Sequence, residues 1–408
     1  MNRTKLDSWI CKTEALPELT REGLERLQLK RLNETLARIH DRGGADRGYP
    51  RRLDTLAQLE RLPFTTPEML AAAPGRWLLT SQSEVERVIS GATSGTTGPA
   101  KRVFYTAQDM EHTVGFFAAG ISEMLPAGES CLIAFPFSGP DGLGDLIARA
   151  VERLGAFPIR AGFGWSWEEA CALVRDTRPD TYIGFPVPLL GLARMYGPGF
   201  PVRRALVSGD ACPAGVMAEL EGLLGSRLYP HYGSRECGLG GAVTCPALEG
   251  MHLRENHIIA EIVDEGGRPL PHGEWGELVI TTIGLEAMPL IRYRTGDFTR
   301  FLPPCPCGGV SRRLDRVSRR EAGPVSMEGL DSALFAIPEL VDYRALWDGR
   351  LHLEARVLRP GAEKAIGAMA QARCPNLDIS VTAAPCRPSE RPMYMGKRYV
   401  RGNRDACR

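Results

Sequence analysis

A segment rich in glycine and hydroxyl side chains is the first part of this sequence that could do chemistry. It lies between strand-like apolar runs and reads Thr93-Ser94-Gly95-Thr96-Thr97-Gly98-Pro99-Ala100-Lys101. Glycine lets backbone N–H groups turn towards an anion, hydroxyls donate hydrogen bonds, and lysine adds a positive charge. The pattern predicts a phosphate-binding loop, with a plain polar turn as the alternative. It is not a Walker loop, because Pro99 and Ala100 separate Gly98 from Lys101.

A tyrosine and a glutamate occur close together in the segment Tyr232-Gly233-Ser234-Arg235-Glu236. A carboxylate such as Glu236, facing a triphosphate, can hold Mg²⁺ while the phosphates supply other ligands. Tyr232 offers a flat face on which adenine can stack. The alternative is a turn tyrosine beside a solvated glutamate. The segment follows Ser208-Gly209-Asp210, which stands at the end of a predicted strand.

Two further motifs lie nearer the C-terminus. Asp297 ends the segment Ile291-Arg292-Tyr293-Arg294-Thr295-Gly296-Asp297. A carboxylate there can accept hydrogen bonds from both hydroxyls of a ribose, and an aspartate in a β-turn is the alternative. The second motif, Gly396-Lys397-Arg398, would on its own be a solvated tail.

Together these motifs resemble those of the adenylate-forming superfamily, which includes acyl-CoA synthetases, luciferases and the adenylation domains of peptide synthetases. The segments Arg87-Val88-Ile89-Ser90-Gly91-Ala92 and Leu62-Pro63-Phe64-Thr65-Thr66 make the chain similar to the phenylacetate-CoA ligase branch. The resemblance covers most of the chain and is best in residues 60 to 320. It implies ATP, Mg²⁺ and coenzyme A as cofactors.

The resemblance also implies a role for each motif. The loop from Thr93 to Gly98 and Lys101 hold the phosphates of ATP, and Glu236 holds Mg²⁺. The remaining nucleotide contacts fall on Ser208, Gly209, Asp210, Tyr232, Gly233, Asp297 and Arg320. Lys397 stands on a C-terminal lid that swings in, and its charge stabilises the transition state of adenylation.

The segment Arg319-Arg320-Glu321-Ala322-Gly323 departs from the family pattern. The family has Gly-Arg there, followed by an acidic hinge residue. Arg320 keeps the ribose or phosphate contact in our interpretation, but the hinge falls on Ala322 or Gly323. Glycine can absorb large backbone changes, so the lid can still turn. The altered hinge and the short lid make the second half-reaction, transfer to coenzyme A, less secure than the first.

Four residues form a candidate zinc site. Cys245 and His252 have six residues between them, and Cys305 and Cys307 have one. All four are predicted in turns, and thiolates with an imidazole suit tetrahedral Zn²⁺. Unpaired thiols are the alternative, because neither spacing is the common Cys-x-x-Cys. Some phenylacetate-ligase relatives resemble this arrangement and carry a structural zinc, and the reserve ligands are Cys237 and His257.

Composition limits the class of protein. The chain has 408 residues, 43% of them hydrophobic and 24% charged, with a net charge of +1. This charge argues against binding to nucleic acid or a membrane surface. No apolar run approaches the roughly 18 residues of a membrane span, and the N-terminus lacks a signal-peptide core. Eleven scattered cysteines fit reduced thiols better than disulfides, so we expect a cytoplasmic protein.

Hydrophobic periodicity predicts an α/β fold. Residues 18 to 41 form an amphipathic helix, Thr66 and Thr106 cap further helices, and the middle of the chain alternates strands with helices. The predicted strands are Cys131 to Phe135, Tyr182 to Phe185 and Ala205 to Ser208; the predicted helices are Asp145 to Leu154, Trp167 to Arg175 and Pro213 to Leu224. This alternation indicates a mostly parallel sheet, which gives way at Ile258 to Val263 and Gly276 to Thr282 to antiparallel strands.

We therefore expect two domains: an AMP-binding domain over residues 1–318, with a β-rich subdomain at about 240–318, and a shortened α+β lid over 319–408. By position, the acyl pocket would use Phe135-Pro136-Phe137-Ser138-Gly139-Pro140 and Gly184-Phe185-Pro186. Such a lining fits an aryl or short apolar acid, although these aromatic residues could equally be core.

The predicted function is AMP-forming ligation of a carboxylic acid to coenzyme A, with Lys397 and Glu236 as the catalytic residues. One alternative is an enzyme that stops at the adenylate or uses another acceptor. The other is a nucleotide-binding regulator that has lost turnover. The expected partners are the small acid and coenzyme A, without nucleic acid or membrane, and a homodimer is compatible with the resemblance.

Overall fold

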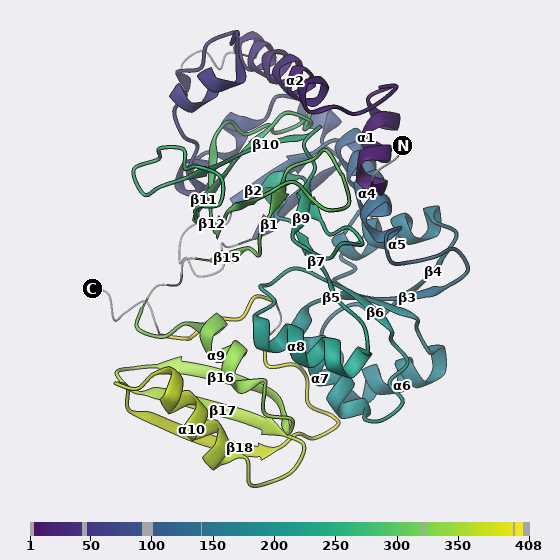
Figure 1. The fold of residues 1–408 in the computed structure, drawn as a ribbon, viewed down its shortest axis with the longest axis vertical. Coiled ribbons are helices and arrows are strands. Elements are labelled where there is room, and N and C mark those ends of the chain that lie inside the picture. The colour runs from purple at the N-terminus through teal and green to yellow at the C-terminus, as the bar shows by residue number, and fades with distance from the viewer. Residues whose placement is uncertain are drawn as a thin grey trace. The chain divides into compact units, whose positions relative to one another are not determined.

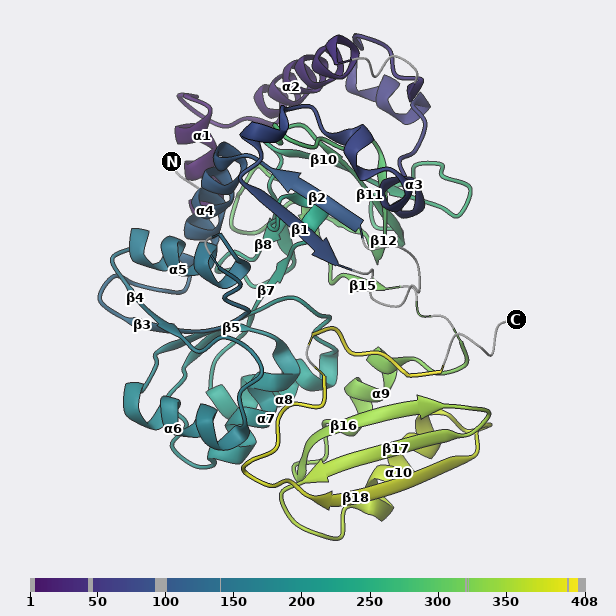
Figure 2. The ribbon, with the colours of Figure 1, turned by 180° about the vertical axis from the view of Figure 1, so that it is seen from behind.

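The computed structural model describes residues 4–42, 47–91, 101–139, 141–319, 321, 323–394 and 396–402. These residues form two compact units, and each unit is assembled from two separate stretches of the chain. The first unit comprises Met1–Glu123 and His231–Arg319, and the second comprises Met124–Pro230 and Arg320–Arg408 (Figures 1 and 2). The chain therefore passes from one unit to the other three times.

The first unit contains four α-helices among its described residues: α1 (Lys5–Thr13), α2 (Arg21–Asp41), α3 (Pro67–Ala72) and α4 (Ala107–Ile121). Its strands are β1 (Arg87–Gly91), β2 (Lys101–Tyr105), β8 (Ala242–Val243), β9 (Met251–Leu253), β10 (Ile258–Val263), β11 (Gly276–Thr282), β12 (Tyr293–Thr299), β13 (Phe301–Leu302), β14 (Arg313–Leu314) and β15 (Ser318–Arg319). Short 3₁₀ turns lie at Leu56–Arg61, Pro74–Trp77, Gln82–Glu84 and Arg235–Cys237.

All the strand pairs within the first unit's described residues are antiparallel. Strands β1 and β2 form a hairpin, and β10, β11, β12 and β15 form a four-stranded sheet in that order. A further run has the order β13-β14-β9-β8 and continues into β7 (Tyr229–Tyr232). The predicted change to antiparallel strands after Ile258 is confirmed.

The second unit begins with four β-α-β steps. Its strands β3 (Ser130–Ala134), β4 (Phe157–Arg160), β5 (Thr181–Gly184) and β6 (Arg204–Val207) alternate with α5 (Leu143–Arg153), α6 (Trp167–Thr177), α7 (Pro186–Tyr196) and α8 (Ala214–Leu224). The pairings β4-β3-β5-β6-β7 are all parallel, because each crossover helix carries the chain back to the end of the sheet at which the preceding strand began. The three predicted strands here each begin and end one residue earlier than expected.

The remainder of the second unit is a small α+β segment. It contains α9 (Met327–Leu334), β16 (Leu340–Trp347), β17 (Leu351–Val357), α10 (Glu363–Arg373) and β18 (Ile379–Pro385). Strands β16, β17 and β18 lie side by side as a three-stranded sheet, antiparallel between the first two and parallel between the last two (Figure 2). The predicted fold class, α/β with a small antiparallel part and a small α+β part, is confirmed.

Local sequence explains why several helices start where they do. The Thr66 hydroxyl caps α3, and proline follows at the first helical position. Thr106 and Asp109 form a reciprocal capping box at the start of α4. Helix α7 was not predicted, because it begins with Pro186 and carries a second proline in its first turn. Its prolines occupy positions where no intrahelical N–H is needed, so the helix tolerates them.

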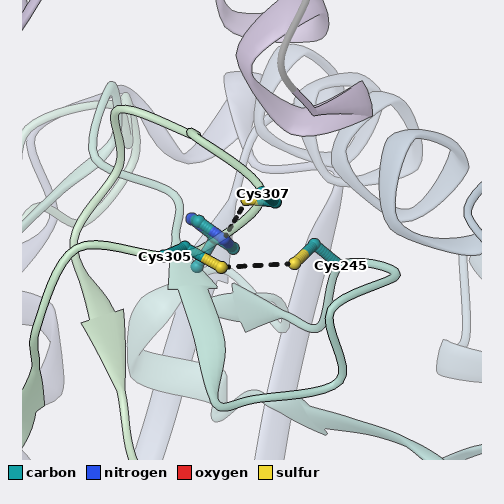
Figure 3. Close-up of side chains that lie close together, drawn as sticks. Cys245, Cys305 and Cys307 are labelled. Carbon is teal, nitrogen blue, oxygen red and sulfur yellow. Dashed lines mark hydrogen bonds between the residues drawn. The ribbon is translucent and has the colours of Figure 1, made fainter.

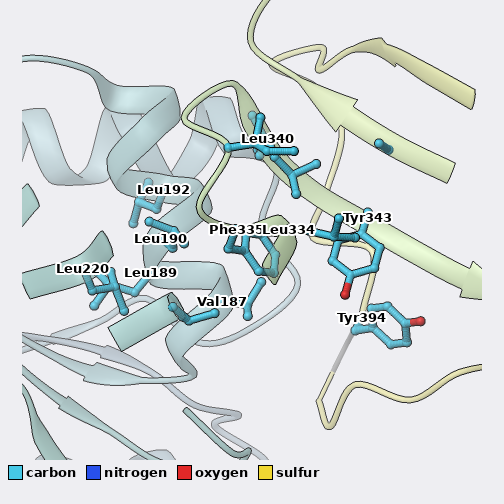
Figure 4. Packing of buried hydrophobic residues seen from close by; sticks show 14 of the residues in the cluster. Val187, Leu189, Leu190, Leu192, Leu220, Leu334, Phe335, Leu340, Tyr343 and Tyr394 are labelled. Carbon is cyan, nitrogen blue, oxygen red and sulfur yellow. The ribbon is translucent and has the colours of Figure 1, made fainter. Parts of the chain in front are cut away.

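One apolar cluster spans the two stretches of the second unit. Leu189, Leu192 and Leu220, from the β-α-β part, belong to it together with Phe335 and Leu340 from the α+β part (Figure 4). All five side chains are fully buried. Each fully buried leucine or phenylalanine is worth about 1.5–3 kcal/mol relative to an exposed one. In this structure the described residues of the α+β segment are therefore packed onto the β-α-β part and share its core.

Helix α2 presents the apolar stripe that its sequence predicts. Leu24, Leu32, Leu36 and Ile39 are completely buried. On the same face the amide of Gln28 donates to the carbonyl oxygens of Glu255, at 2.9 Å, and Ile258. Among the described residues, no helix combines the length and the hydropathy that crossing a bilayer requires.

Candidate active site

Lys101 begins strand β2 at the point where the glycine-rich loop ends. The hairpin pairs Gly91 with Lys101, as expected for a loop between two strands. Residues Thr93 to Gly98 themselves lie outside the described part of the chain. Lys101 is 6% exposed, and its ammonium group donates to Glu236 and, at 2.7 Å, to the hydroxyl of Tyr293.

Glu236 receives hydrogen bonds from two side chains. Besides Lys101, the Tyr293 hydroxyl donates to its Oε1 at 3.2 Å. Burial alone would raise the pKa of Glu236, but the Lys101 ammonium outweighs burial and holds that pKa below its ordinary value. The two residues predicted to hold phosphate and Mg²⁺ are thus adjacent and paired with each other.

Asp297 is held by Tyr232. The Tyr232 hydroxyl donates to Asp297 Oδ2 at 2.9 Å, and the tyrosine is only 8% exposed. Burial, followed by the Asp297 carboxylate, raises the pKa of Tyr232 well above its ordinary value, so the hydroxyl stays protonated and keeps donating. Tyr232, predicted as a stacking surface, therefore also orients the predicted ribose acceptor.

Gly233 has a packing reason to be glycine. A Cβ at this position would lie 2.1 Å from the carbonyl oxygen of Leu239, a backbone atom that cannot move away cheaply. The close approach lets the chain turn directly after Tyr232. The glycine of the Tyr-Gly pair therefore serves the backbone path that carries Tyr232 and Glu236.

The two arginines of the Arg292-Tyr293-Arg294 motif are structural. Arg292 is 2% exposed, adopts a left-handed φ of 46°, and donates to Glu261 at 2.9 Å and to the Leu62 carbonyl at 2.8 Å. Arg294 donates to Glu277. These ion pairs hold the start of β12, so that Tyr293 and Asp297 are presented from a fixed strand.

In the second unit, Ser208-Gly209-Asp210 follows the carboxyl end of β6, where ligands bind in parallel α/β sheets. Gly209 has a φ of 81°, and a Cβ there would lie 2.5 Å from Phe185. Asp210 Oδ2 accepts a 2.8 Å hydrogen bond from the backbone N–H of Arg398. The structure thus brings Asp210 next to the C-terminal motif, in which Lys397 is exposed.

The four predicted zinc ligands come together in the first unit, and Figure 3 labels the three cysteines among them. Their ligand atoms all lie within 4.8 Å of one another, with Cys245 Sγ 3.7 Å from Cys305 Sγ and Cys307 Sγ 3.4 Å from His252 Nε2. Four ligands at zinc–sulfur distances of about 2.3 Å form a tetrahedron with edges of about 3.8 Å, so the spacing suits zinc. The backbone carbonyl of Ser311 lies 3.0 Å from His252 Nδ1, which leaves Nε2 for a metal.

Two details of the zinc prediction change. His252 lies on strand β9, whereas a turn was predicted. The reserve ligands Cys237 and His257 do not belong to the cluster formed by the described residues. Cys245 and Cys305 each begin a turn, because their carbonyl oxygens accept from the N–H groups of Leu248 and Gly308, and Cys307 lies within the second turn, as expected.

Comparison with known proteins decides the family. Residues 92–287 match the family model described as AMP-binding enzyme. The phenylacetate-coenzyme A ligase of Escherichia coli (strain K12) is 31% identical over 347 residues, which cover 81% of this chain and 77% of that protein. The phenylacetate-coenzyme A ligase of Thermus thermophilus is 30% identical over 366 residues, covering 80% and 79%. The chain belongs to the phenylacetate-coenzyme A ligase family of AMP-binding enzymes.

Solved structures show the same fold as this member of the ligase family. A 2-hydroxyisobutyryl-CoA ligase in the postadenylation state has a TM-score of 0.78 at 18% identity, covering 94% of this chain and 90% of that one. The same enzyme in the thioesterification state has a TM-score of 0.68 at 19% identity, with coverage of 93% and 90%. The family resemblance expected from the motifs is confirmed.

Two residues of this ligase-family chain were missed by sequence reasoning. Tyr293 lies inside a recognised motif, but nothing in the motif indicates that its hydroxyl bridges Lys101 and Glu236. Arg398 directly follows Lys397 and has no role of its own in the sequence prediction, yet it is only 7% exposed. Arg320, predicted to contact the nucleotide, lies outside the described residues. Its neighbour Arg319 lies opposite Asp297 in the register of the antiparallel strands β15 and β12.

Proposed function

We propose that the protein is an ATP-dependent, AMP-forming ligase that joins a carboxylic acid to coenzyme A. The observation that carries the proposal is identity of about 30% over four fifths of the chain to phenylacetate-coenzyme A ligases. The buried Lys101–Glu236 pair and the Tyr232–Asp297 pair support it, because both stand at the motif positions expected to contact ATP.

The reaction has two steps. A carboxylate oxygen attacks the α-phosphorus of ATP, the bond between the α-phosphorus and the bridging oxygen breaks, and pyrophosphate leaves. The thiol of coenzyme A then attacks the acyl carbon, its proton goes to solvent, and the bond to AMP breaks. No protein nucleophile is required, so the protein contributes positioning and electrostatic stabilisation.

Each site residue has a defined part in this proposal. Lys101 and the loop from Thr93 to Gly98 bind the phosphates that leave as pyrophosphate, and Asp297 accepts from the ribose. Lys397 neutralises charge that builds between carboxylate and α-phosphate. Mg²⁺ would neutralise the phosphates when bound, and Glu236 is its protein ligand: its carboxylate is ionised, as a magnesium ligand must be.

The acid is proposed to be aryl or short and apolar. Phe135 and Phe185 meet edge to face with ring centroids 5.0 Å apart, and Phe163 lies 4.9 Å from Phe185. Two of these rings, Phe135 and Phe185, lie beside the end of β6, because a Cβ added at Gly209 would meet both of them. Such a surface favours an apolar acyl group over a polar one.

Three further points belong to the proposal. Residues 319–408 are proposed to act as the lid domain. A structural zinc is proposed at Cys245, His252, Cys305 and Cys307, because four protein ligands would leave no open position for catalysis. A cytoplasmic location is proposed, since the ten cysteines in the described part of the chain are all free.

The test is acid-dependent exchange of pyrophosphate into ATP, followed by thioester formation with coenzyme A, across a panel of aryl and short carboxylic acids. We expect exchange with at least one acid, followed by its thioester. Lys397→Ala should lose most exchange while ATP still binds. Absence of exchange with every acid would favour a nucleotide-binding regulator, and exchange without thioester would favour another acceptor.

A further inference from the structure

An arginine buried directly after the proposed catalytic lysine has no assigned role. Arg398 is 7% exposed and belongs to the second unit. Burying a guanidinium is expensive unless its donors are all satisfied, so such a residue needs a reason to be there. The family motif requires only the glycine and the lysine that precede it.

Every donor group of the Arg398 side chain has a partner. Its Nε donates to Asp331 at 3.0 Å, its Nη1 to Asp342 at 2.7 Å, and its Nη2 to the carbonyl of Tyr343 at 3.0 Å. Both aspartates are themselves buried, and Tyr343 also donates to Asp331 at 2.6 Å. A planar group bound on three sides has one position and one orientation, which a lysine could not reproduce.

Aromatic rings close the remaining faces of this guanidinium. The centroids of Tyr394, Tyr343 and Phe335 lie 4.7, 4.8 and 5.3 Å from its central carbon. All three residues belong to the apolar cluster of the second unit, and all are labelled in Figure 4. The guanidinium is therefore fixed to the core of this unit.

The backbone around Arg398 is fixed as well. Its N–H donates to Asp210 Oδ2 at 2.8 Å, which ties the C-terminal segment to the end of β6. Two residues on, Val400 is buried, whereas Lys397 and Tyr399 are exposed. The side chains of Arg398 and Val400 therefore face the interior of this unit, whereas those of Lys397 and Tyr399 face solvent. Lys397 is exposed, and it directly precedes the residue whose side chain is anchored inward and whose N–H is bound by Asp210.

We propose that Arg398 is a positioning residue for Lys397: the guanidinium held by Asp331 and Asp342, and the N–H held by Asp210, together set where Lys397 stands during adenylation. The inference rests on the proposed function, because it gives Arg398 a part in the first half-reaction only. Gly396 supports it, since its φ of 139° favours glycine and lets the chain turn sharply just before Lys397. Gly396, Arg398 and Asp210 also line one small hollow with Phe185.

The inference is tested with Arg398→Lys, Lys397→Ala and the double variant. Arg398→Lys keeps the positive charge but loses the planar guanidinium that binds three partners at once. We therefore expect kcat for pyrophosphate exchange to fall about 10–100-fold, with KM for ATP nearly unchanged. Thioester formation from a pre-made acyl-adenylate should stay within about threefold of wild type. The double variant should exchange no more slowly than Lys397→Ala, because Arg398 acts through the lysine.

Asp210→Ala removes the hydrogen bond from the Arg398 N–H to Asp210 and leaves the partners of the Arg398 guanidinium intact. We expect the same selective loss of exchange and faster hydrogen exchange of residues 396–402. A rise in KM for ATP with unchanged kcat would instead assign Asp210 to nucleotide binding and would contradict its part in positioning Lys397. The matched control is Arg194→Lys, because Arg194 is also buried and donates to carbonyls of Phe335 and Leu340, in the same core. It should lower Tm without separating the two half-reactions.

Additive losses in the double variant, or equal losses in both half-reactions for Arg398→Lys, would show a purely structural role and overturn the inference. If wild type shows no exchange with any acid, the proposed function fails, and hydrogen exchange still decides the positioning: unchanged protection of residues 396–402 in Asp210→Ala refutes it. If Lys397→Ala exchanges normally, the lysine loses its role and the inference falls with it.

Discussion

At the scale of single residues, the most informative feature is the hydroxyl of Tyr293. Lys101 and Glu236 form a buried ion pair, and such pairs are stable only when their remaining hydrogen-bonding groups are satisfied. Tyr293 accepts from Lys101 and donates to Glu236. In the proposed reaction Lys101 must exchange the carboxylate for a phosphate, and Tyr293 can then keep Glu236 oriented for Mg²⁺.

Tyr293→Phe should therefore weaken the binding of MgATP. We expect KM for MgATP to rise about 10–100-fold, because one hydrogen bond to a charged group contributes about 1.5–3 kcal/mol. The measurement is pyrophosphate exchange as a function of Mg²⁺ concentration. Tyr105→Phe is the matched control, because the buried hydroxyl of Tyr105 donates to the backbone of Arg235. Equal effects of the two variants on Mg²⁺ dependence would contradict the role of Tyr293.

A second prediction concerns His257, which is 2% exposed and packs against the rings of Trp9 and His112. Burial, followed by the charge of Arg254, lowers the pKa of His257 well below its ordinary value. The folded chain therefore keeps this ring neutral, while the unfolded chain takes up a proton below about pH 6.5. The contribution of the neutral His257 ring to the free energy of unfolding is therefore fully present above that pH and is lost as the pH falls.

His257→Leu should reduce this acid sensitivity. Each proton taken up only by the unfolded chain costs about 1.4 kcal/mol of unfolding free energy per pH unit. The measurement is urea unfolding at about pH 6 and pH 5. The slope of the unfolding free energy against pH should correspond to close to one proton fewer in the variant than in wild type. The control His272→Leu removes an exposed histidine. An unchanged slope in His257→Leu would contradict the prediction.

At the scale of elements, sequence patterns predicted the helices, strands and turns that depend on residues close together in the sequence. The strands of the parallel sheet, the capped starts of α3 and α4 and the hairpin around the loop are all local, because a few adjacent side chains determine them. The Tyr232–Asp297 and Asp210–Arg398 hydrogen bonds join residues 65 and 188 positions apart. Nothing in either segment alone indicates its partner, and only the resemblance suggested that Tyr232 and Asp297 serve one site.

The two glycines of helix α8 give a prediction at this scale. A Cβ on Gly215 would lie 1.9 Å from the backbone oxygen of Ser332 in α9, whereas a Cβ on Gly222 would meet nothing within 4 Å. We expect Gly215→Ala to destabilise the protein by about 1–3 kcal/mol through overpacking of the two helices. Gly222→Ala should stabilise it by up to about 1 kcal/mol, because alanine favours helix. Chemical denaturation of both variants measures the difference, and equal effects would refute the close approach.

At the scale of the whole molecule, the division into two units shows which distant segments of the chain share a core, and the sequence did not indicate this. The parallel strand-helix region was assigned to one domain with everything before residue 318. In the structure it shares a core with residues 325–400, while the N-terminal helices share a unit with the antiparallel sheets. The amphipathic stripe of α2 indicated that it packs on something larger, but a stripe does not identify its partner.

The last prediction uses this division to test the proposed zinc. Its four ligands belong to the first unit, and helix α1 is attached to the same loop: Asp7 accepts from the backbone of Val310 at 3.0 Å. Removing a metal that closes loops raises the chain entropy of the region it ties together. Chelation, or Cys245→Ser, should therefore speed amide hydrogen exchange at residues 245–252, 305–311 and 5–13.

The second unit provides the internal reference for that experiment. Its residues 130–230 and 325–400 have their own core and contain none of the four ligands, so their exchange should stay unchanged. Elemental analysis should give about one zinc per chain in wild type and in the control Cys386→Ser, whose thiol lies in the second unit. Far less than one zinc in wild type would remove the site. Equal loss of protection in both units would show that the metal stabilises the molecule as a whole and does not act through these loops.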